Sequence, residues 1–550
     1  MLTGSDASAL VEDSGFQKCW RELAGKCPWA TVFQLPEFVC TWYRIFASKY
    51  SPAIVTGLDA GGQIGGLLTL ACSEDGKELF CAGTHHAEYQ VWLTGPESGN
   101  AFITAALMHL RKAFPAVRTL RFLHLPVQTP LDWTRSDAVW SKQHDLLSLP
   151  RPLMHIGDGT QFAAALAKKR YRNRISKLRQ MGALEFEQIT GPDQLETMFD
   201  QIVTLCDFRH GAAHGTLPFR NNSFKRPLYL ALSRVPGLVH VTVLKLNEQI
   251  VSAQFNFRDR DQLVLGTLMH SPWFGEYSPG TLHTYFLGSE LASQMVSTVD
   301  LTPGASYKDK FATHYDEVHI LTVFLHRDEY LRRRALSGFK EAGRRLCRLA
   351  GLRPAALLAW MARARQTIAH PVQALRRSPD EQVFQLYSFS ISGGPRLPDP
   401  QAVVRDCLDH LLCFSDLNGI KKTREFLQPA LERIEAGSRV YTRVVAGRLT
   451  FQAWLTQTPE RTLPRPQGPF PVEPGSPVLY DVRYHVPSGE KDDKALLTGV
   501  LHDAALLTGS KLIYMLISPN DFRLQTMIQE LGGAYHRAIL LNSAAPDAAS

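Results

Sequence analysis

The sequence of 550 residues lacks several features that mark common protein classes. Its nine cysteines are scattered and form no CxxC pair with a matching partner, which argues against a zinc framework and is typical of a reducing compartment. Because no run of about 18 apolar residues is present, no transmembrane helix is predicted. Residues 1–15 show no basic segment followed by an apolar one, so we predict no signal peptide and expect a cytoplasmic protein.

Three common catalytic motifs are also missing. The sequence contains no GxSxG nucleophile elbow, no Walker phosphate-binding loop and no HExxH zinc motif. The net charge of +8 is only mildly basic, so it permits acidic partners but selects none. Hydrophobic residues make up 45% and charged residues 20%, which fits a folded chain, and the length predicts about three domains.

Residues 1–150 are predicted to form a mixed α/β unit. Phe38, Trp42 and Phe46 recur at helical spacing after a Pro-Glu start. The stretch PAIVTGLDAGGQIGGLLTLACSE predicts two strands around a glycine-rich turn at 59–62. A helix (FITAALMHLRKAF) and a strand (VRTLRFLHL) follow.

Residues 151–325 repeat a similar order. A three-stranded meander is predicted in VHVTVLKLNEQIVSAQFNFRDRDQLVLGTLMH, with turns at 247–248 and 258–261. A helix opened by Ser278-Pro279-Gly280 and a strand in VSTVDLTPG come next. The similar order of elements indicates a duplicated α/β module.

Residues 326–385 are predicted to be a basic helical linker. From Arg327 to Arg377, 13 Arg and Lys residues stand against 3 Asp and Glu residues, with Ala and Leu between them. Two interpretations stay open. The linker is either a solvated helix pair packed on a neighbour, or a contact to a membrane surface or a polysaccharide synthase.

Residues 386–550 are predicted to contain three strands, a helix, a strand, a helix begun by Asn520 and a last strand after LGG, with a proline-rich loop inside. This order resembles the GCN5-related N-acetyltransferase (GNAT) fold, and the resemblance rests on Gly447-Arg448-Leu449, on YDVRYHVP and on Asn520. In that family, a loop and the following helix N-terminus bind the pyrophosphate of CoA. Here the loop reads PSGEKDDKALL, with Gly489 out of register.

Two carboxylates, Asp492 and Asp493, stand where this loop would meet a pyrophosphate. They would repel it. This departure argues against cofactor binding, and we interpret the last unit as a structural or degenerate accessory GNAT-like domain.

The helix start in the middle unit offers a better phosphate site. Ser278, Gly280 and Thr281 can supply N–H and hydroxyl donors there. Gln254 and Asn256 lie on a preceding strand, where an acyl carbonyl or amide can be held. An ordinary helix-opening turn and a polar strand face explain the same residues, and both interpretations stay open.

A basic segment, LAKKRYRNRISKLRQMG, precedes the meander. It holds seven Lys and Arg residues within 168–179 and no acid, and Tyr171, Ile175 and Leu178 recur at helical spacing. An amphipathic helix is predicted, whose basic face is either solvated or contacts a phosphate or polyanion. Slight aromatic interleaving argues against nucleic acid as a partner.

Four motifs occur in order: PWATVFQLPEFVCTWYRIF, KKRYRNRISKLRQMG, YSPGTLHTYFLGSELAS and DLTPGASYKDKF. Together they resemble bacterial acetyltransferases of the CelD/BcsL type, associated with cellulose and exopolysaccharide biosynthesis and related to Fem-type aminoacyltransferases. The resemblance covers about residues 15–325. It implies an α/β (α+β) fold of tandem GNAT-like acyl-CoA N-acyltransferase modules with mixed sheets, ahead of the C-terminal GNAT-like domain.

Fem-type enzymes carry a Phe-Lys-x-x-Phe motif at the end of their second half. The segment Tyr307–Phe311 resembles it, with Tyr in place of the first Phe. The resemblance implies that Lys308, next to Tyr307, stabilises an oxyanion or a substrate phosphate. The alternative is a strand-end lysine that pairs with Asp300 or Asp309.

Acid and base groups are offered by AGTHHAEYQVWL, which holds His85, His86, Glu88 and Tyr89. We take Glu88 and His86 as candidates for deprotonating the acceptor. Adjacent histidines point apart and no third ligand is suitably spaced, so no metal is expected. A second pair of histidines, in CDFRHGAAHG, is four residues apart, but its glycines predict a loop.

We therefore predict a GNAT-type acyltransferase that moves an acyl group, from acetyl-CoA or another acyl-CoA, to an amine or hydroxyl of a small-molecule or saccharide acceptor. Such transfer proceeds by direct attack on the thioester, which explains the missing signatures. The site is expected in residues 1–325, with CoA in 151–325. Two alternatives stay open: a Fem-like aminoacyltransferase that uses charged transfer RNA, and a non-catalytic scaffold of a polysaccharide-synthesis machine.

Overall fold

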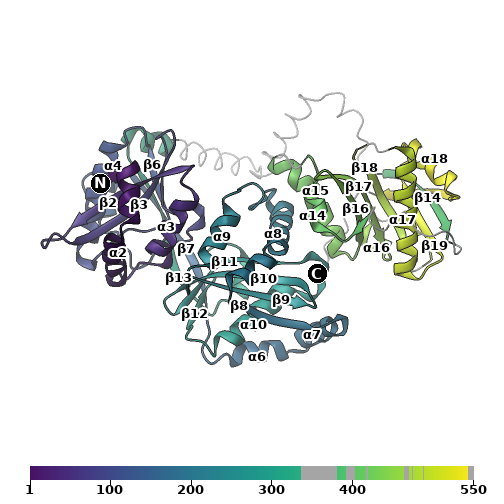
Figure 1. The fold of residues 1–550 in the computed structure, drawn as a ribbon, viewed down its shortest axis with the longest axis horizontal. Coiled ribbons are helices and arrows are strands. Elements are labelled where there is room, and N and C mark those ends of the chain that lie inside the picture. Colours follow the sequence, from purple (N-terminus) through teal and green to yellow (C-terminus); the bar gives the residue numbers. More distant parts are fainter. Residues whose placement is uncertain are drawn as a thin grey trace, which may run out of the picture. The chain divides into compact units, whose positions relative to one another are not determined.

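The computed structural model describes residues 1–335, 381–391, 403–416, 419–463, 470–473, 475–486 and 489–542. Its contacts divide the chain into two units (Figure 1). Unit 1 comprises Met1–Asp200, Asn222–His270 and the chain from Tyr277 to the first gap; unit 2 comprises Gln201–Asn221, Ser271–Glu276 and the described residues after 380. Most of the predicted linker, 326–385, lies outside the described residues.

Unit 1 begins with an antiparallel five-stranded sheet in the order β1-β2-β3-β4, with β5 paired to β3. The predicted helices and the predicted hairpin are confirmed. The elements of this part are β1 (Leu2–Thr3), α1 (Gly4–Glu12), α2 (Ser14–Lys26), η1 (Val32–Gln34), α3 (Pro36–Ile45), β2 (Tyr50–Leu58), β3 (Ile64–Ser73), β4 (Leu79–Cys81), η2 (Thr84–His86), β5 (Leu93–Thr94), η3 (Pro96–Ser98), α4 (Gly99–Ala113), β6 (Thr119–Pro126), α5 (Trp133–Ser136) and η4 (Trp140–Lys142).

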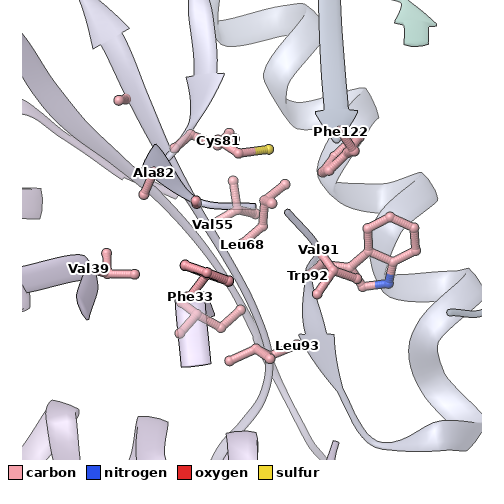
Figure 2. Close-up of a cluster of buried hydrophobic side chains, with 14 of the residues drawn as sticks. Phe33, Val39, Val55, Leu68, Cys81, Ala82, Val91, Trp92, Leu93 and Phe122 are labelled. Carbon is pink, nitrogen blue, oxygen red and sulfur yellow. The ribbon is translucent and has the colours of Figure 1, made fainter. Parts of the chain in front are cut away.

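Helix α3 shows why this part folds. Pro36 occupies its first turn, where a missing N–H costs nothing. Phe38 and Trp42 are fully buried, and the ring of Trp42 stacks on that of Phe46 with centroids 4.9 Å apart. Figure 2 shows part of the same core, where Trp92 and Phe122 meet edge to face at 5.5 Å. Aromatic packing thus stabilises the part of unit 1 that holds the residues after β4.

The second sheet of unit 1 has eight strands in the order β6-β13-β7-β12-β11-β10-β9-β8. It confirms the predicted meander, the helix after it and the basic helix. The predicted boundary at residue 150 falls inside β7. The elements are β7 (His144–His155), α6 (Thr160–Ala167), α7 (Lys169–Met181), β8 (Leu184–Ile189), α8 (Pro192–His214), α9 (Lys225–Ser233), β9 (Val239–Leu246), β10 (Gln249–Asp259), β11 (Gln262–His270), η5 (Pro272–Tyr277), α10 (Pro279–Leu291), β12 (Thr298–Asp300), η6 (Ser306–Lys310) and β13 (His314–Phe324).

The loop predicted around His210 and His214 is wrong, because α8 runs through His214. An interior glycine, Gly211, costs a helix about 1 kcal/mol relative to alanine. A Cβ at this position would lie 2.4 Å from a methyl carbon of Leu427, so close packing accounts for the glycine.

Unit 2 holds a seven-stranded sheet in the order β15-β16-β17-β18-β19-β14-β20, with α14 and α15 on the other side of the strands from α17 in Figure 1. The predicted strands and helices are confirmed, except that Asp521 rather than Asn520 caps α18. The elements are β14 (Glu381–Ser390), β15 (Val404–Arg405), α14 (Leu408–Leu411), α15 (Ile420–Glu435), β16 (Arg439–Val445), β17 (Arg448–Thr456), α16 (Pro459–Thr462), β18 (Val478–Tyr484), α17 (Glu490–Thr508), β19 (Leu512–Ile517), α18 (Phe522–Glu530) and β20 (Ala534–Asn542).

The eight-stranded and seven-stranded sheets share one device. Among the described strands, each sheet has a single parallel pair, β11 with β12 and β18 with β19, joined through α10 and α17 respectively. Pairing covers only three and two residue pairs, so the partners separate beyond it. The strand before each crossover also carries a bulge, at Gly266 in β11 and at Asp481 and Val482 in β18. A bulge leaves a backbone group unpaired at the point of separation.

Candidate functional site

Lys308 is held inside unit 1 by the turn that follows β12. Its Nζ donates to the carbonyl oxygen of Thr302 at 3.1 Å and to the Thr302 hydroxyl at 2.9 Å, with a longer contact of 3.5 Å to the carbonyl of Pro303. Thr302 has a φ of +59°, which bends the chain back over the ammonium group. The side chain is 9% exposed, so Lys308 is not a solvated loop charge.

Neither carboxylate proposed as a partner of Lys308 bonds to it. Asp309 instead accepts a hydrogen bond from the hydroxyl of Tyr315 at 2.9 Å. Asp300 acts on Lys308 through its charge and through the turn, because one carboxylate oxygen accepts the N–H of Thr302 at 2.8 Å. Tyr307, next to Lys308 in the chain, is 48% exposed.

Asp300 is the centre of a buried network. Its second oxygen accepts the hydroxyl of Tyr89 at 2.5 Å and lies 3.3 Å from a guanidinium nitrogen of Arg151. Arg151 also binds Asp316 with two nitrogens, one of them at 2.7 Å. Burial raises the pKa of Asp300, and the charge of Arg151 and the Tyr89 hydroxyl oppose that rise. Tyr89, which precedes β5, and Arg151 of β7 therefore both bind the carboxylate of Asp300.

Glu88 places a titratable carboxyl beside this network. Its side chain is half-buried, and burial raises the pKa of Glu88 to about 7, while the charge of Lys308 pulls it down and that of Asp300 pushes it up. In turn, burial lowers the pKa of Lys308, and Glu88 and Asp300 counteract this. The carbonyl oxygen of Glu88 lies 2.9 Å from Nδ1 of His124, which must therefore carry the proton.

His86 lies apart from the Lys308 network. Its Nδ1 is 3.4 Å from the indole nitrogen of Trp42, and its ring packs on Phe46 with centroids 5.1 Å apart. Burial lowers the pKa of His86 to about 3, with help from His85 and Lys225. Such a weak base is poorly suited to take a proton near neutral pH. A role for His86 stays a prediction, to which this geometry adds no support.

The start of α10 gathers positive charge. Lys310 donates to the hydroxyl of Thr281 at 3.0 Å, and its ammonium lies 5.6 Å from the ring centre of Tyr171. The guanidinium of Arg170 lies over the same ring at 4.4 Å. Basic helix α7 and the end of the Tyr-Lys segment therefore converge on this helix start. Such a setting favours an anion.

The predicted donors at this helix start are only partly available. Ser278 caps α10 in the left-handed region, with φ +52°. Its carbonyl accepts the N–H groups of Thr281 and Leu282, at 3.0 and 3.1 Å, and Pro279 has no N–H. Gly280 packs close to His270, whose ring nitrogen would lie 3.3 Å from a Cβ placed there.

Gln254 lies deeper than predicted. It is 1% exposed, and its amide nitrogen donates to the side-chain oxygen of Asn256 at 2.9 Å. Asn256 in turn donates to the carbonyl of His240 at 3.4 Å. The pair belongs to a polar row beneath α10, in which His283 and Thr242 are joined at 2.8 Å. Within the described residues, the Oε1 atom of Gln254 has no hydrogen-bond partner.

A cavity of about 410 Å³ borders the buried network, sharing Arg151 and Asp316 with it. Asp259 also lines it, and burial together with the charge of Asp300 raises the pKa of Asp259 to about 6 against the pull of Arg260. A second cavity, of about 780 Å³, lies in unit 2 between the diverging strands β18 and β19.

The acidic start of α17 differs from its prediction in part. Asp493 is fully buried and forms an ion pair with Arg523 of α18, so its charge is balanced. Asp492 is exposed and remains an acidic group at that helix start. Among the described residues, no group of three or more His, Cys, Asp or Glu side chains could hold a metal ion. No described helix is long and apolar enough to cross a membrane.

Several network residues escaped prediction. Asp300 was considered only as a partner of Lys308, and Lys310 was not assigned a role although it lies two residues further on. Arg151 and Tyr89 lie 149 and 211 residues from Asp300 in the chain. Tyr89 had a sequence signal in its place within the motif AGTHHAEYQVWL, whereas Arg151 lies in no such motif.

Two sheets that each have one parallel strand pair, a bulge in the strand before it and a crossover helix are typical of the GNAT class of acyltransferase fold. Residues 166–312 match the family model described as an acetyltransferase (GNAT) domain. The predicted fold class, mixed α/β with GNAT-like modules, is confirmed. No curated protein matches the chain.

Among solved structures, the chain is similar to a conserved protein of unknown function from Bacteroides thetaiotaomicron (11% identity, 56% of this chain and 97% of the other, TM-score 0.39). It is also similar to FemX (11% identity, 60% and 99%, TM-score 0.38). A third similar structure is L-PGS from Bacillus licheniformis (10% identity, 57% and 92%, TM-score 0.35). The fold assignment rests on the family model and on the sheets described above.

Proposed function

We propose that the protein transfers an acyl group from an acyl-CoA, acetyl-CoA in the first place, to an amine or hydroxyl of a small-molecule or saccharide acceptor. The observation that carries the proposal is the electrostatic interaction of Glu88 and Lys308. One is an acid with a pKa of about 7, the other a buried cation, and each acts on the charge of the other. Both residues belong to unit 1, and Lys308 lies within residues 166–312, which match the GNAT acetyltransferase model.

Glu88 is the proposed general base. Acceptor attack on a thioester carbonyl forms a new C–N or C–O bond and breaks the C–S bond, and the acceptor must lose one proton. A carboxylate whose pKa is about 7 is half-deprotonated at neutral pH and still basic enough to take that proton. The leaving thiolate then takes up a proton, which balances the reaction.

Lys308 is the proposed electrostatic stabiliser. Negative charge develops on the carbonyl oxygen during attack, and a fixed cation in a water-poor site stabilises it more than water does. Thr302 fixes the ammonium from two sides, and Asp300 fixes Thr302. Tyr307 is a neighbour of this group without a contact to the network.

Lys310, Arg170 and Thr281 are proposed to hold the phosphates of the acyl donor at the start of α10. Lys310 bonds to Thr281, Arg170 and Lys310 both lie over the ring of Tyr171, and the helix N-terminus adds its own positive end. The acceptor is proposed to enter through the 410 Å³ cavity beside Arg151 and Asp316. A role in exopolysaccharide biosynthesis, of the CelD/BcsL type, is the context that the sequence resemblance favours.

The test is release of free thiol from acetyl-CoA in the presence of glucosamine or glucose, with mass spectrometry of the acylated product. We expect acceptor-dependent release by the native protein and almost none by Lys308→Ala. Absence of release with acetyl-CoA and with longer acyl donors would contradict the proposal. Aminoacyl transfer from charged transfer RNA, detected by mass spectrometry of the aminoacylated acceptor, would instead establish the Fem-like alternative.

A further inference from the structure

Two adjoining cavities in unit 2 share three charged residues. The larger, of about 780 Å³, lies where β18 and β19 diverge, and a smaller one of about 130 Å³ lies against α15. Arg433, Asp481 and Arg483 line both. None of these three residues belongs to α17, the helix with the acidic start.

The three charged groups form a fixed cationic cluster. Asp481 accepts hydrogen bonds from Arg433 and from Nε of Arg483, the latter at 2.5 Å. Burial would raise the pKa of Asp481, but the two guanidinium groups outweigh it and lower the pKa. The cluster therefore keeps one net positive charge. Since each guanidinium carries five N–H donors, one carboxylate cannot use them all.

Aromatic rings hold Arg433 in place. Its guanidinium lies 5.1 Å from the ring centre of Trp454 and 5.4 Å from that of Tyr480. Asp481 has a φ of +48° in the bulge of β18, a costly conformation for a residue other than glycine. Such strain is often found at ligand sites, where the surrounding contacts maintain it.

Two uncharged groups at the smaller cavity have unmet hydrogen-bonding capacity. Gln452 and Trp454 line it and are 3% and 1% exposed. In the part of the chain that the structure describes, Oε1 of Gln452 and Nε1 of Trp454 have no hydrogen-bond partner. Buried polar groups are almost always paired, so an acceptor and a donor at one cavity indicate a polar occupant.

Other acids at these cavities are already engaged. Asp521 lines the larger cavity, but its carboxylate accepts the N–H of Leu524 at 3.0 Å as the cap of α18. Glu425 lines the smaller one and lies 3.7 Å from the ammonium of Lys421. Asp521 and Glu425 keep their negative charges, so the cationic hydrogen-bond donors among the described lining residues are Arg433 and Arg483.

We propose that unit 2 binds a small anionic ligand, whose carboxylate or phosphate meets Arg433 and Arg483 and whose hydroxyl or amide groups meet Gln452 and Trp454. This site does not involve Lys308 or the start of α10. Unit 2 is then a binding module with its own ligand, whether or not the start of α17 binds CoA.

The experiment is isothermal titration calorimetry of the full-length protein with glucuronate, glucose 6-phosphate and glucose at one ionic strength. We expect one or both anionic sugars to bind and glucose to bind at least tenfold more weakly. Preference between the two anions identifies the carboxylate or the phosphate as the recognised group. Arg483→Gln should weaken binding of the anion by about 10- to 100-fold, because a charge-assisted hydrogen bond is lost.

Arg448→Gln is the matched control, since Arg448 is exposed at the start of β17, on the same strand as Gln452 and outside both cavities. It should leave the affinity unchanged. Arg433→Lys, which keeps a charge but loses the fork geometry, should weaken binding to an intermediate degree. No binding of either anion at millimolar concentration, or equal effects of Arg483→Gln and Arg448→Gln, would overturn the proposal. Lys308→Ala should not alter this binding, which separates it from the proposed transferase site.

Discussion

The starts of α10 and α17 occupy the same position in two similar sheets, yet they carry opposite charges. Each helix follows a bulged strand and leads to the strand paired in parallel with it. At α10, Lys310 and Arg170 gather around Thr281 and Tyr171. At α17, an ion pair with Arg523 balances the charge of Asp493, and Asp492 is exposed.

This difference teaches that the backbone arrangement does not by itself decide which unit takes an acyl donor. Helix N-termini attract anions through their dipoles in both cases. Lys310 and Arg170 reinforce that attraction at α10, whereas the exposed carboxylate of Asp492 opposes it at α17. The comparison supports the proposal that the acyl donor binds in unit 1.

The largest expected effect is on catalysis in unit 1. Lys308→Ala should lower kcat/KM for acyl transfer by about 100- to 1000-fold, because a preorganised charge at the developing oxyanion is lost. Steady-state kinetics with acetyl-CoA would measure it. Lys77→Ala, at an exposed lysine of the same unit, is the control. A fully active Lys308→Ala protein with native thermal stability would remove Lys308 from the mechanism.

The ion pair of Asp493 and Arg523 should contribute strongly to the stability of unit 2. Arg523→Ala removes the arginine that forms an ion pair with the buried Asp493 and should reduce the free energy of unfolding by about 3 kcal/mol. Urea unfolding monitored by circular dichroism would measure this change. Asp493→Asn in the Arg523→Ala background should recover much of the loss, and a failure to recover it would show that the charge of Asp493 is not the cause.

Acyl-donor affinity should separate the two helix starts. Lys310→Ala should weaken binding of acetyl-CoA about tenfold, since one charge-assisted contact to phosphate is lost. Asp492→Ala should leave that affinity unchanged. Calorimetry on both variants measures it. If Asp492→Ala strengthened binding while Lys310→Ala had no effect, the acyl donor would belong to unit 2 instead.

A smaller effect is expected on the pH profile. A general base must be deprotonated, so activity should rise with pH through about 7, the pKa of Glu88. The positive charge of Lys308 lowers the pKa of Glu88, so the residual activity of Lys308→Ala should rise at higher pH than that of the native protein. Glu88→Gln should abolish this limb of the kcat/KM profile. An unchanged profile in Glu88→Gln would assign the base to another group.

Much of the fold was predictable because its signals are local. Helical spacing of Phe38 and Trp42 and the glycine-rich turn before β3 depend only on neighbouring residues. The helix at His210 was missed because Gly211 is there for packing against Leu427, a contact that local spacing does not reveal.

The sequence by itself determined the ordered motifs, the GNAT-like succession of elements and the interest of Lys308. Tertiary structure alone decided that Lys308 is buried, that its charge acts on Glu88, and that Asp300 joins Tyr89 to Arg151. It also decided that Asp493 is neutralised by Arg523, 30 residues away. The physical reason is that charge, desolvation and pKa depend on distances in space, whereas spacing along the chain specifies only which residues share an element.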